Sequence, residues 1–173
     1  MMTDDNNVSR TGNFRAVVRV GKTATEYVRS GSGRPVVLLT RTASPLSLWN
    51  AVIEAVAARY RLIAPDVTPG AEDFAGWLGP FLDGLGLCRV SILADGPMSA
   101  PAIGYAMLDP DRVERLIVIT PAASSVAEPL TDAPGSPMII GEGRPIPTIV
   151  DDVLQFLEGP VMAAARGVRT ADA

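Results

Sequence analysis

Short apolar runs alternate along the chain with longer stretches in which apolar residues recur every three or four positions. The short runs are almost continuously apolar, as expected of strands buried on both faces of a sheet. They occupy residues 35–40, 61–64, 89–94, 115–120 and 137–141. The longer stretches have the spacing of helices with one buried face, and they predict helices over residues 47–60, 72–85, 97–108 and 148–157.

The first part of the ordered chain has a different pattern. Residues 14–20 and 25–29 are predicted to form a pair of strands that turn at Gly21-Lys22. After it, alternation of strand and helix implies right-handed crossovers. The predicted fold is therefore α/β, with a mainly parallel sheet and helices on both faces. Ligands of such sheets bind at the carboxyl ends of the strands.

The length and composition fit one globular domain. The chain has 173 residues, of which 47% are hydrophobic and 20% charged, and this balance is typical of a folded core rather than of disorder. We expect a single domain over residues 13–162, a disordered leader over 1–12 and a flexible tail over 163–173.

The charge and the cysteine content limit the binding partners and the cellular compartment that we expect. The 15 basic and 19 acidic residues give a net charge of -4, which argues against nucleic acid as a partner. No apolar run approaches the length of about 20 residues that spans a membrane, and the first residues lack the apolar core of a secretory signal. Cys88 is the only cysteine. A cytoplasmic protein without disulfides is expected.

The chain contains no histidine. Imidazole is the usual general base near neutral pH, because its pKa lies close to 6.5. Any acid–base chemistry must therefore use other side chains or the substrate itself. A histidine-containing zinc site is excluded, as is a cysteine cluster. We expect neither a metal nor a cofactor.

The order of segments resembles the α/β-hydrolase superfamily from about Gly31 to Gly159, with large internal deletions. The family's third strand, first helix and fourth strand look like GSGRPVVLLT…SPLSLWNAVIEAVAARYRLIAPD. Its nucleophile elbow, with the flanking helices and strands, resembles FLDGLGLCRVSILADGPMSAPAIGYAMLDPDRVERLIVITPAA. Its acid-bearing strand and last helix resemble PMIIGEGRPIP…VLQFLEG. The resemblance implies a shortened α/β-hydrolase fold without the lid domain, since only a loop over 122–136 replaces it.

The catalytic triad of that family has no counterpart here. The family's elbow is G-x-S-x-G, and the corresponding residues are Ala94-Asp95-Gly96-Pro97-Met98, which place Gly96 at the nucleophile position. Arg144 corresponds to the acid, and the loop that carries the histidine is missing. The resemblance therefore does not imply an ordinary serine hydrolase.

A set of residues on carboxyl-end loops is predicted to bind ligand: Thr40, Arg41, Thr42, Asp95, Gly96 and Arg144. Arg41 and Arg144 would suit a carboxylate or a phosphate, because guanidinium groups bind oxyanions through paired hydrogen bonds. Two solvated arginines that pair with neighbours such as Glu142 explain the same pattern. Ser44 would add a hydroxyl donor.

Asp95 and Ser99 are weak catalytic candidates. Asp95 could orient a ligand or act as a base, but the favoured interpretation is an N-cap for the helix that starts at Pro97. Ser99 could be a displaced nucleophile, but it is more simply a small residue between helix and sheet. Cys88 is interpreted as a small buried residue away from the ligand crevice. Trp49 and Tyr105 are expected in the core or pocket wall.

Two functions remain open from the sequence. In the first, the chain binds an acyl group linked to coenzyme A or to an acyl-carrier protein, and assists its transfer to a second substrate in a biosynthetic pathway. Orientation alone can accelerate such a transfer. In the second, it is a non-catalytic pseudo-hydrolase that binds a ligand or serves as a partner subunit. A homodimer would bury apolar surface uncovered by the missing lid.

Overall fold

The computed structural model describes residues 14–20, 23–40, 46–66, 74–120, 137–141 and 145–159. Their strands are β1 (Phe14–Val20), β2 (Thr23–Ser30), β3 (Pro35–Leu39), β4 (Arg61–Pro65), β5 (Val90–Asp95), β6 (Val113–Thr120) and β7 (Met138–Gly141). Their helices are α1 (Leu46–Ala57), α2 (Phe74–Gly84), α3 (Ser99–Leu108) and α4 (Ile146–Glu158), and a 3₁₀ turn covers Gly96–Met98.

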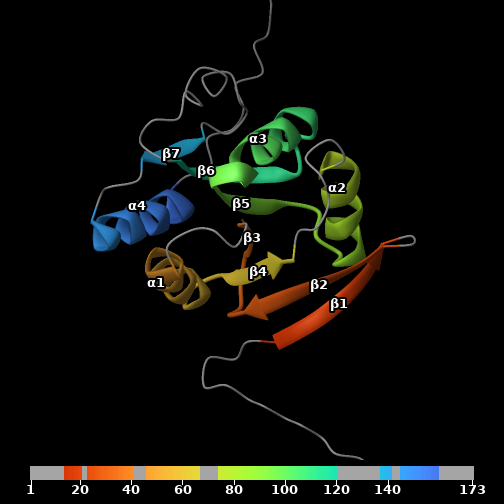
Figure 1. The fold of residues 1–173 in the computed structure, drawn as a ribbon, viewed down its shortest axis with the longest axis horizontal. Helices are drawn as coiled ribbons and strands as arrows, with labels where there is room; N and C mark the ends of the chain where they lie inside the picture. Colours follow the sequence, from red (N-terminus) through yellow and green to blue (C-terminus); the bar gives the residue numbers. More distant parts are fainter. Residues whose placement is uncertain are drawn as a thin grey trace, which may run out of the picture.

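The strands form one sheet in the order β1-β2-β4-β3-β5-β6-β7 (Figure 1). The strands from β3 to β7 pair in parallel, whereas β2 is antiparallel to both β1 and β4. The predicted mainly parallel α/β sheet is confirmed. The two initial strands form the expected antiparallel pair, but their predicted turn at Gly21-Lys22 lies outside the described residues.

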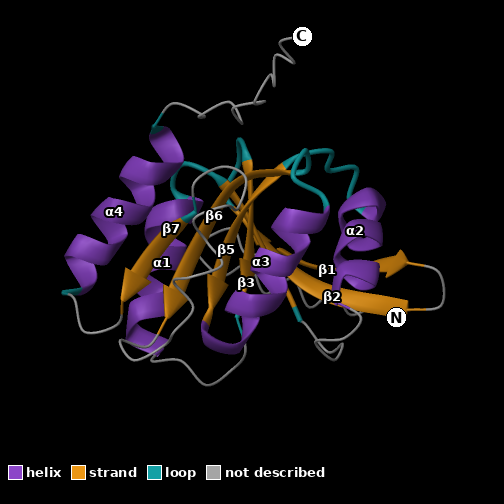
Figure 2. Ribbon diagram, turned by 90° about the horizontal axis from the view of Figure 1, so that it is seen from above, coloured by secondary structure: helices purple, strands orange, loops and turns teal. Residues whose placement is uncertain are grey.

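Helices cover both faces of the sheet, as predicted (Figure 2). Successive residues of a strand point to opposite faces, and β5 shows this with two adjacent core residues. Ile92 packs in the cluster that includes α2 and α3, and Leu93 packs in the cluster that includes α1 and α4. Both side chains are fully buried. The sheet therefore separates two hydrophobic cores that share its strands.

The hairpin of β1 and β2 is attached to α2 by aromatic packing and one buried hydrogen bond. Trp77 of α2 donates from Nε1 to Oγ1 of Thr25 over 3.0 Å. Phe81 stacks on Trp77 and meets Tyr27 of β2 edge to face. These contacts fix the position of the outer strands against the rest of the sheet.

The carboxyl end of α4 is held by a cation from β6. Arg115 is buried, and its guanidinium donates to the carbonyl oxygens of Phe156 and Gly159. The last carbonyls of a helix lack partners within the helix, and a cation there also interacts favourably with the helix dipole. Arg115 thus ties α4 to the sheet.

Several element boundaries differ from the sequence predictions. The first helix ends at Ala57 rather than at Tyr60, and the third helix proper starts at Ser99, after the 3₁₀ turn. The expected leader, the tail and the loop over 122–136 lie outside the described residues. Among the described residues, no helix is long and apolar enough to cross a membrane.

Candidate functional site

The carboxyl ends of the parallel strands meet at one edge of the sheet, where ligands of this architecture bind. Leu39 of β3 is the register partner of Ala94 of β5. The residues that follow them, Thr40 and Asp95, therefore emerge beside each other. The chain after Asp95 turns at Gly96 into the 3₁₀ turn and then into α3. We consider this edge the candidate site.

Gly96 adopts a backbone conformation that suits glycine. Its φ is +47°, in the left-handed region, and a Cβ placed on it would meet no atom of the described residues within 4 Å. A side chain at this turn would therefore have room, although its backbone would be strained. The structure keeps a sharp strand-to-helix turn at the position predicted to match the nucleophile elbow. That position carries no side chain.

Pro97 removes a second part of the usual catalytic machinery. In the α/β-hydrolase elbow, the backbone N–H of the residue after the nucleophile helps to bind the oxyanion. A proline has no N–H, so this donor is chemically absent here. The sequence itself contains this signal, although Pro97 was considered above only as the start of a predicted helix.

Asp95 is buried, with 1% of its surface exposed. The prediction that it caps the following helix is wrong, because its side chain makes no capping hydrogen bond. The helix proper starts four residues later, at Ser99. Asp95 instead accepts a long hydrogen bond from Oγ1 of Thr40, at 3.4 Å from Oδ2. Two of the predicted ligand-binding residues are thus brought together.

Ser99 lies at the start of α3 and is 2% exposed. Its hydroxyl has no hydrogen-bond partner among the described residues. A buried hydroxyl without a partner normally costs stability. The small side chain is consistent with its interpretation as a packing residue. Nothing among the described residues contacts its hydroxyl as a catalytic base would.

The predicted arginine clamp remains a prediction. Arg41, Thr42, Ser44 and Arg144 lie outside the described residues, as does Glu142. The alternatives of an oxyanion clamp and of solvated ion pairs are both still open.

The remaining candidates lie away from this edge. Cys88 is exposed, so its interpretation as a buried small residue is wrong. It precedes β5, at the amino end of that strand. Tyr105 is buried in the core, as expected. Burial raises the pKa of its hydroxyl, Arg112 opposes the rise, and Asp109 and Asp83 add to it.

The sheet order, the helices on both faces and the turn at Gly96 define the α/β-hydrolase fold in a shortened form. Gly96 stands at the position predicted to match the nucleophile, and these 173 residues include no histidine.

Comparison with known proteins supports this assignment. A 2-hydroxy-6-oxo-2,4-heptadienoate hydrolase from Pseudomonas putida is 28% identical, with 67% of this chain matching 47% of that protein. Carboxylesterase CesB from Bacillus subtilis superposes with a TM-score of 0.56 at 22% identity, over 64% of this chain and 44% of the esterase. Haloalkane dehalogenase DatA from Agrobacterium tumefaciens gives a TM-score of 0.53 at 22% identity, over 62% and 41%. No family model matches the chain.

This chain spans less than half the length of each of these relatives. The structural neighbours establish the fold, and the enzymes among them differ in the bond that their names say they cleave. The fold therefore does not select one reaction for this chain.

Proposed function

We propose that this chain is a non-catalytic member of the hydrolase-like fold that binds a small carbonyl-containing ligand at the carboxyl edge of its sheet. The observation that carries the proposal is the Gly96–Pro97 pair. Gly96 has no side chain to attack a carbonyl, and Pro97 has no amide hydrogen to stabilise the oxyanion. Oxyanion stabilisation is usually the largest single contribution to acyl-transfer catalysis.

The surroundings of Gly96 support a ligand-binding role for this turn. No described residue fills the position where a side chain would lie, and the Asp95–Thr40 hydrogen bond places polar groups beside it. The matched hydrolase from Pseudomonas putida is named for a 2-hydroxy-6-oxo-2,4-heptadienoate. A dienoate of this kind is therefore the first ligand to test.

Acyl transfer between two bound substrates is the second candidate. Its support is the same carboxylate, because Asp95 lies beside the bare turn. An acceptor amine would attack the carbonyl of a bound thioester, and its proton would pass to Asp95 through the Thr40 hydroxyl. The C–S bond would then break, and the leaving thiolate would take that proton back from Asp95 to give the free thiol and the amide. Proximity alone can accelerate such a reaction. The lack of an amide donor at Pro97 makes this candidate the weaker one.

One experiment distinguishes ligand binding without catalysis from acyl transfer. The purified chain is mixed with activated esters, acyl-thioesters with an amine acceptor, and a 2-hydroxy-6-oxo-dienoate. Turnover, intact mass and thermal stability are then measured. Binding without chemistry predicts a higher Tm with ligand, an unchanged mass and no turnover above buffer. Acyl transfer predicts acceptor acylation without a covalent adduct.

A matched pair of variants locates the binding. Gly96→Leu fills the open position above the turn. Gly86→Leu introduces the same kind of strain elsewhere, since Gly86 has a φ of +66° and equally open space. Ligand stabilisation should be lost only in Gly96→Leu. Efficient ester hydrolysis with a trapped adduct on a hydroxyl would refute both functions, and equal loss in both variants would refute the site.

A further inference from the structure

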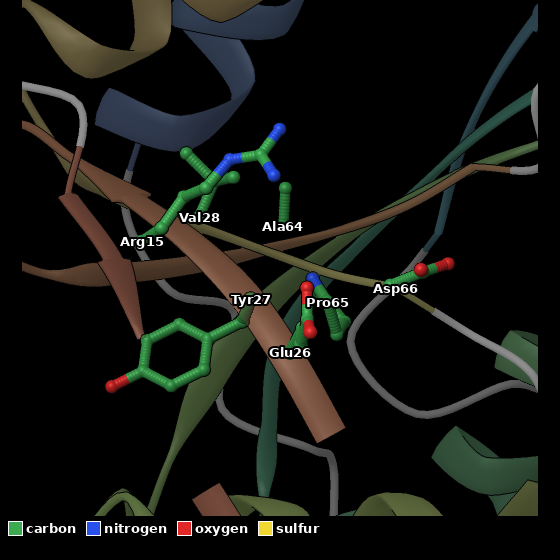
Figure 3. Close-up of a pocket in the computed structure, with 7 residues that line it drawn as sticks. All are labelled: Arg15, Glu26, Tyr27, Val28, Ala64, Pro65 and Asp66. Atoms are coloured by element: carbon green, nitrogen blue, oxygen red, sulfur yellow. The ribbon is translucent and has the colours of Figure 1, made fainter. Parts of the chain in front are cut away.

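A cavity lies away from Gly96, on the side of the sheet that α1 covers. Its volume is about 220 Å³. The lining residues come from the antiparallel part of the sheet: Arg15, Glu26, Tyr27, Val28, Ala64, Pro65 and Asp66 (Figure 3). None of these residues belongs to the turn after β5 or to the candidate site described above.

The strand register explains why these side chains converge. Arg15 is the partner of Val28, and Val28 is the partner of Ala64, so the three form one row across β1, β2 and β4. Ala64 packs against the core that includes α1. Val28 and Ala64 thus form an apolar floor, and the guanidinium of Arg15 stands at one end of it.

Two carboxylates complete the cavity. Glu26 precedes Val28 by two residues and so faces the same side of β2. Asp66 follows β4, and its N–H donates to the carbonyl oxygen of Glu26 over 2.8 Å. In Figure 3 the guanidinium of Arg15 lies on the Ala64 side, the carboxylate of Glu26 lies beside Pro65, and the carboxylate of Asp66 lies on the far side of Pro65 and points away from Arg15. Positive and negative groups therefore occupy different parts of the cavity.

The charged side chains that line the cavity are those of Arg15, Glu26 and Asp66. No ion pair or side-chain hydrogen bond joins another described residue to Arg15, Glu26 or Asp66. Elsewhere in the described chain such pairs occur, as between Arg112 and Asp83 at 2.8 Å. All three side chains are exposed, and none of them is paired within the described part of the chain.

We propose that this cavity binds a basic α-amino acid. Arg15 would bind the carboxylate, because the guanidinium fork matches it. Glu26 and Asp66 would bind the α-ammonium and the side-chain cation, while the aliphatic stem lies on Val28 and Ala64. One cation and two anions give the site a net charge of -1, which matches the charge of +1 on lysine or arginine. The cavity is smaller than pockets for drug-sized ligands, which start at about 300 Å³.

Titration of the full chain with L-lysine and L-arginine, followed by calorimetry and NMR, tests the proposal. Cadaverine lacks the carboxylate and L-norleucine lacks the side-chain cation, so each removes one predicted contact. Arg15→Gln should weaken binding of the amino acids by at least about tenfold. Arg19→Gln is the matched control, because Arg19 lies on the same strand, is also exposed and does not line the cavity.

The expected pattern is specific. Arg15→Gln lowers affinity for lysine but not for cadaverine, Glu26→Gln lowers affinity for both, and Arg19→Gln changes neither beyond about twofold. Unchanged circular dichroism and Tm would show that the variants fold. No saturable binding at about 10 mM ligand, equal effects of Arg15→Gln and Arg19→Gln, or equal affinity for norleucine would each overturn the proposal. Loss of binding in Gly96→Leu alone would place the ligand at the other site and overturn it as well.

Discussion

Three of the four described glycines with a positive φ differ in their surroundings. Gly96 and Gly86 have open space where a Cβ would lie, whereas a Cβ on Gly31 would lie 2.1 Å from the carbonyl oxygen of Ala57. Backbone strain alone costs about 1–2 kcal/mol for a non-glycine residue. The same conformation therefore has two different consequences for substitution.

Alanine at these positions tests that difference. We expect Gly96→Ala and Gly86→Ala each to lower the free energy of unfolding by about 1–2 kcal/mol, and Gly31→Ala to lower it further because its backbone must also move. Gly104, within α3, should instead gain about 1 kcal/mol as alanine. Urea unfolding measures the free energy of unfolding of all four alanine variants. A cost at Gly96 as large as at Gly31 would show that the space above the turn is filled.

The buried hydroxyl of Tyr105 gives a pH-dependent prediction. It has no hydrogen-bond partner among the described residues, and burial raises its pKa above the usual value near 10. The unfolded chain then ionises first as the pH rises, so the wild type loses stability above about pH 10. Tyr105→Phe removes this dependence and should be neutral or stabilising at pH 7.

The measurement is the difference in unfolding free energy between wild type and Tyr105→Phe from pH 7 to about pH 11. Taking a difference cancels the contributions of the other tyrosines. The advantage of the variant should grow with pH. A difference that is constant across this range would contradict the prediction.

Single residues show where sequence reasoning succeeds and where it stops. The bare turn at Gly96 was predictable because its sequence neighbours resemble a known motif. The contact between Thr40 and Asp95 was not, because it depends on which strands lie side by side. The cap predicted for Asp95 failed because a 3₁₀ turn separates it from α3, and sequence composition does not distinguish that turn from a helix.

At the scale of elements, one hydrogen bond joins the hairpin to α2. Replacing Thr25 with valine keeps its shape but leaves the buried N–H of Trp77 without its acceptor. Such a loss costs about 1–3 kcal/mol. Urea unfolding of Thr25→Val should show a decrease of this size, while Thr25→Ser keeps the hydroxyl and should lose less. Equal losses would indicate that the methyl group, not the hydrogen bond, matters at this position.

Elements were largely predictable because each has a distinct period. Fully buried strands such as β5 read as continuous apolar runs, and helices such as α4 show one apolar face. Their ends were less accurate, since capping contacts come from distant residues. Arg115 of β6 donates to the carbonyl oxygens at the end of α4. No sequence pattern around Glu158 predicts these hydrogen bonds.

At the scale of the whole molecule, the two cores meet only through the sheet, and adjacent residues of β5 belong to different cores. We expect Ile92→Ala and Leu93→Ala each to cost about 2–5 kcal/mol. Because both cores need the same strands, each variant should still unfold in one transition. Circular dichroism and tryptophan fluorescence should give coincident curves, and separated curves in either variant would show that the cores unfold independently.

The fold class followed from the alternation of strands and helices, but the order of strands in the sheet did not. Alternation does not state that β4 lies between β2 and β3, as the structure shows. The candidate site depends on that order, because Thr40 and Asp95 meet only when β3 and β5 are neighbours.

The Gly96–Pro97 pair also restricts how this chain can evolve. A codon change at position 96 would supply a hydroxyl, but the next residue would still lack an amide hydrogen, and no imidazole is encoded in these 173 residues. A complete hydrolase elbow would therefore need at least two substitutions at this turn and a histidine placed beside them.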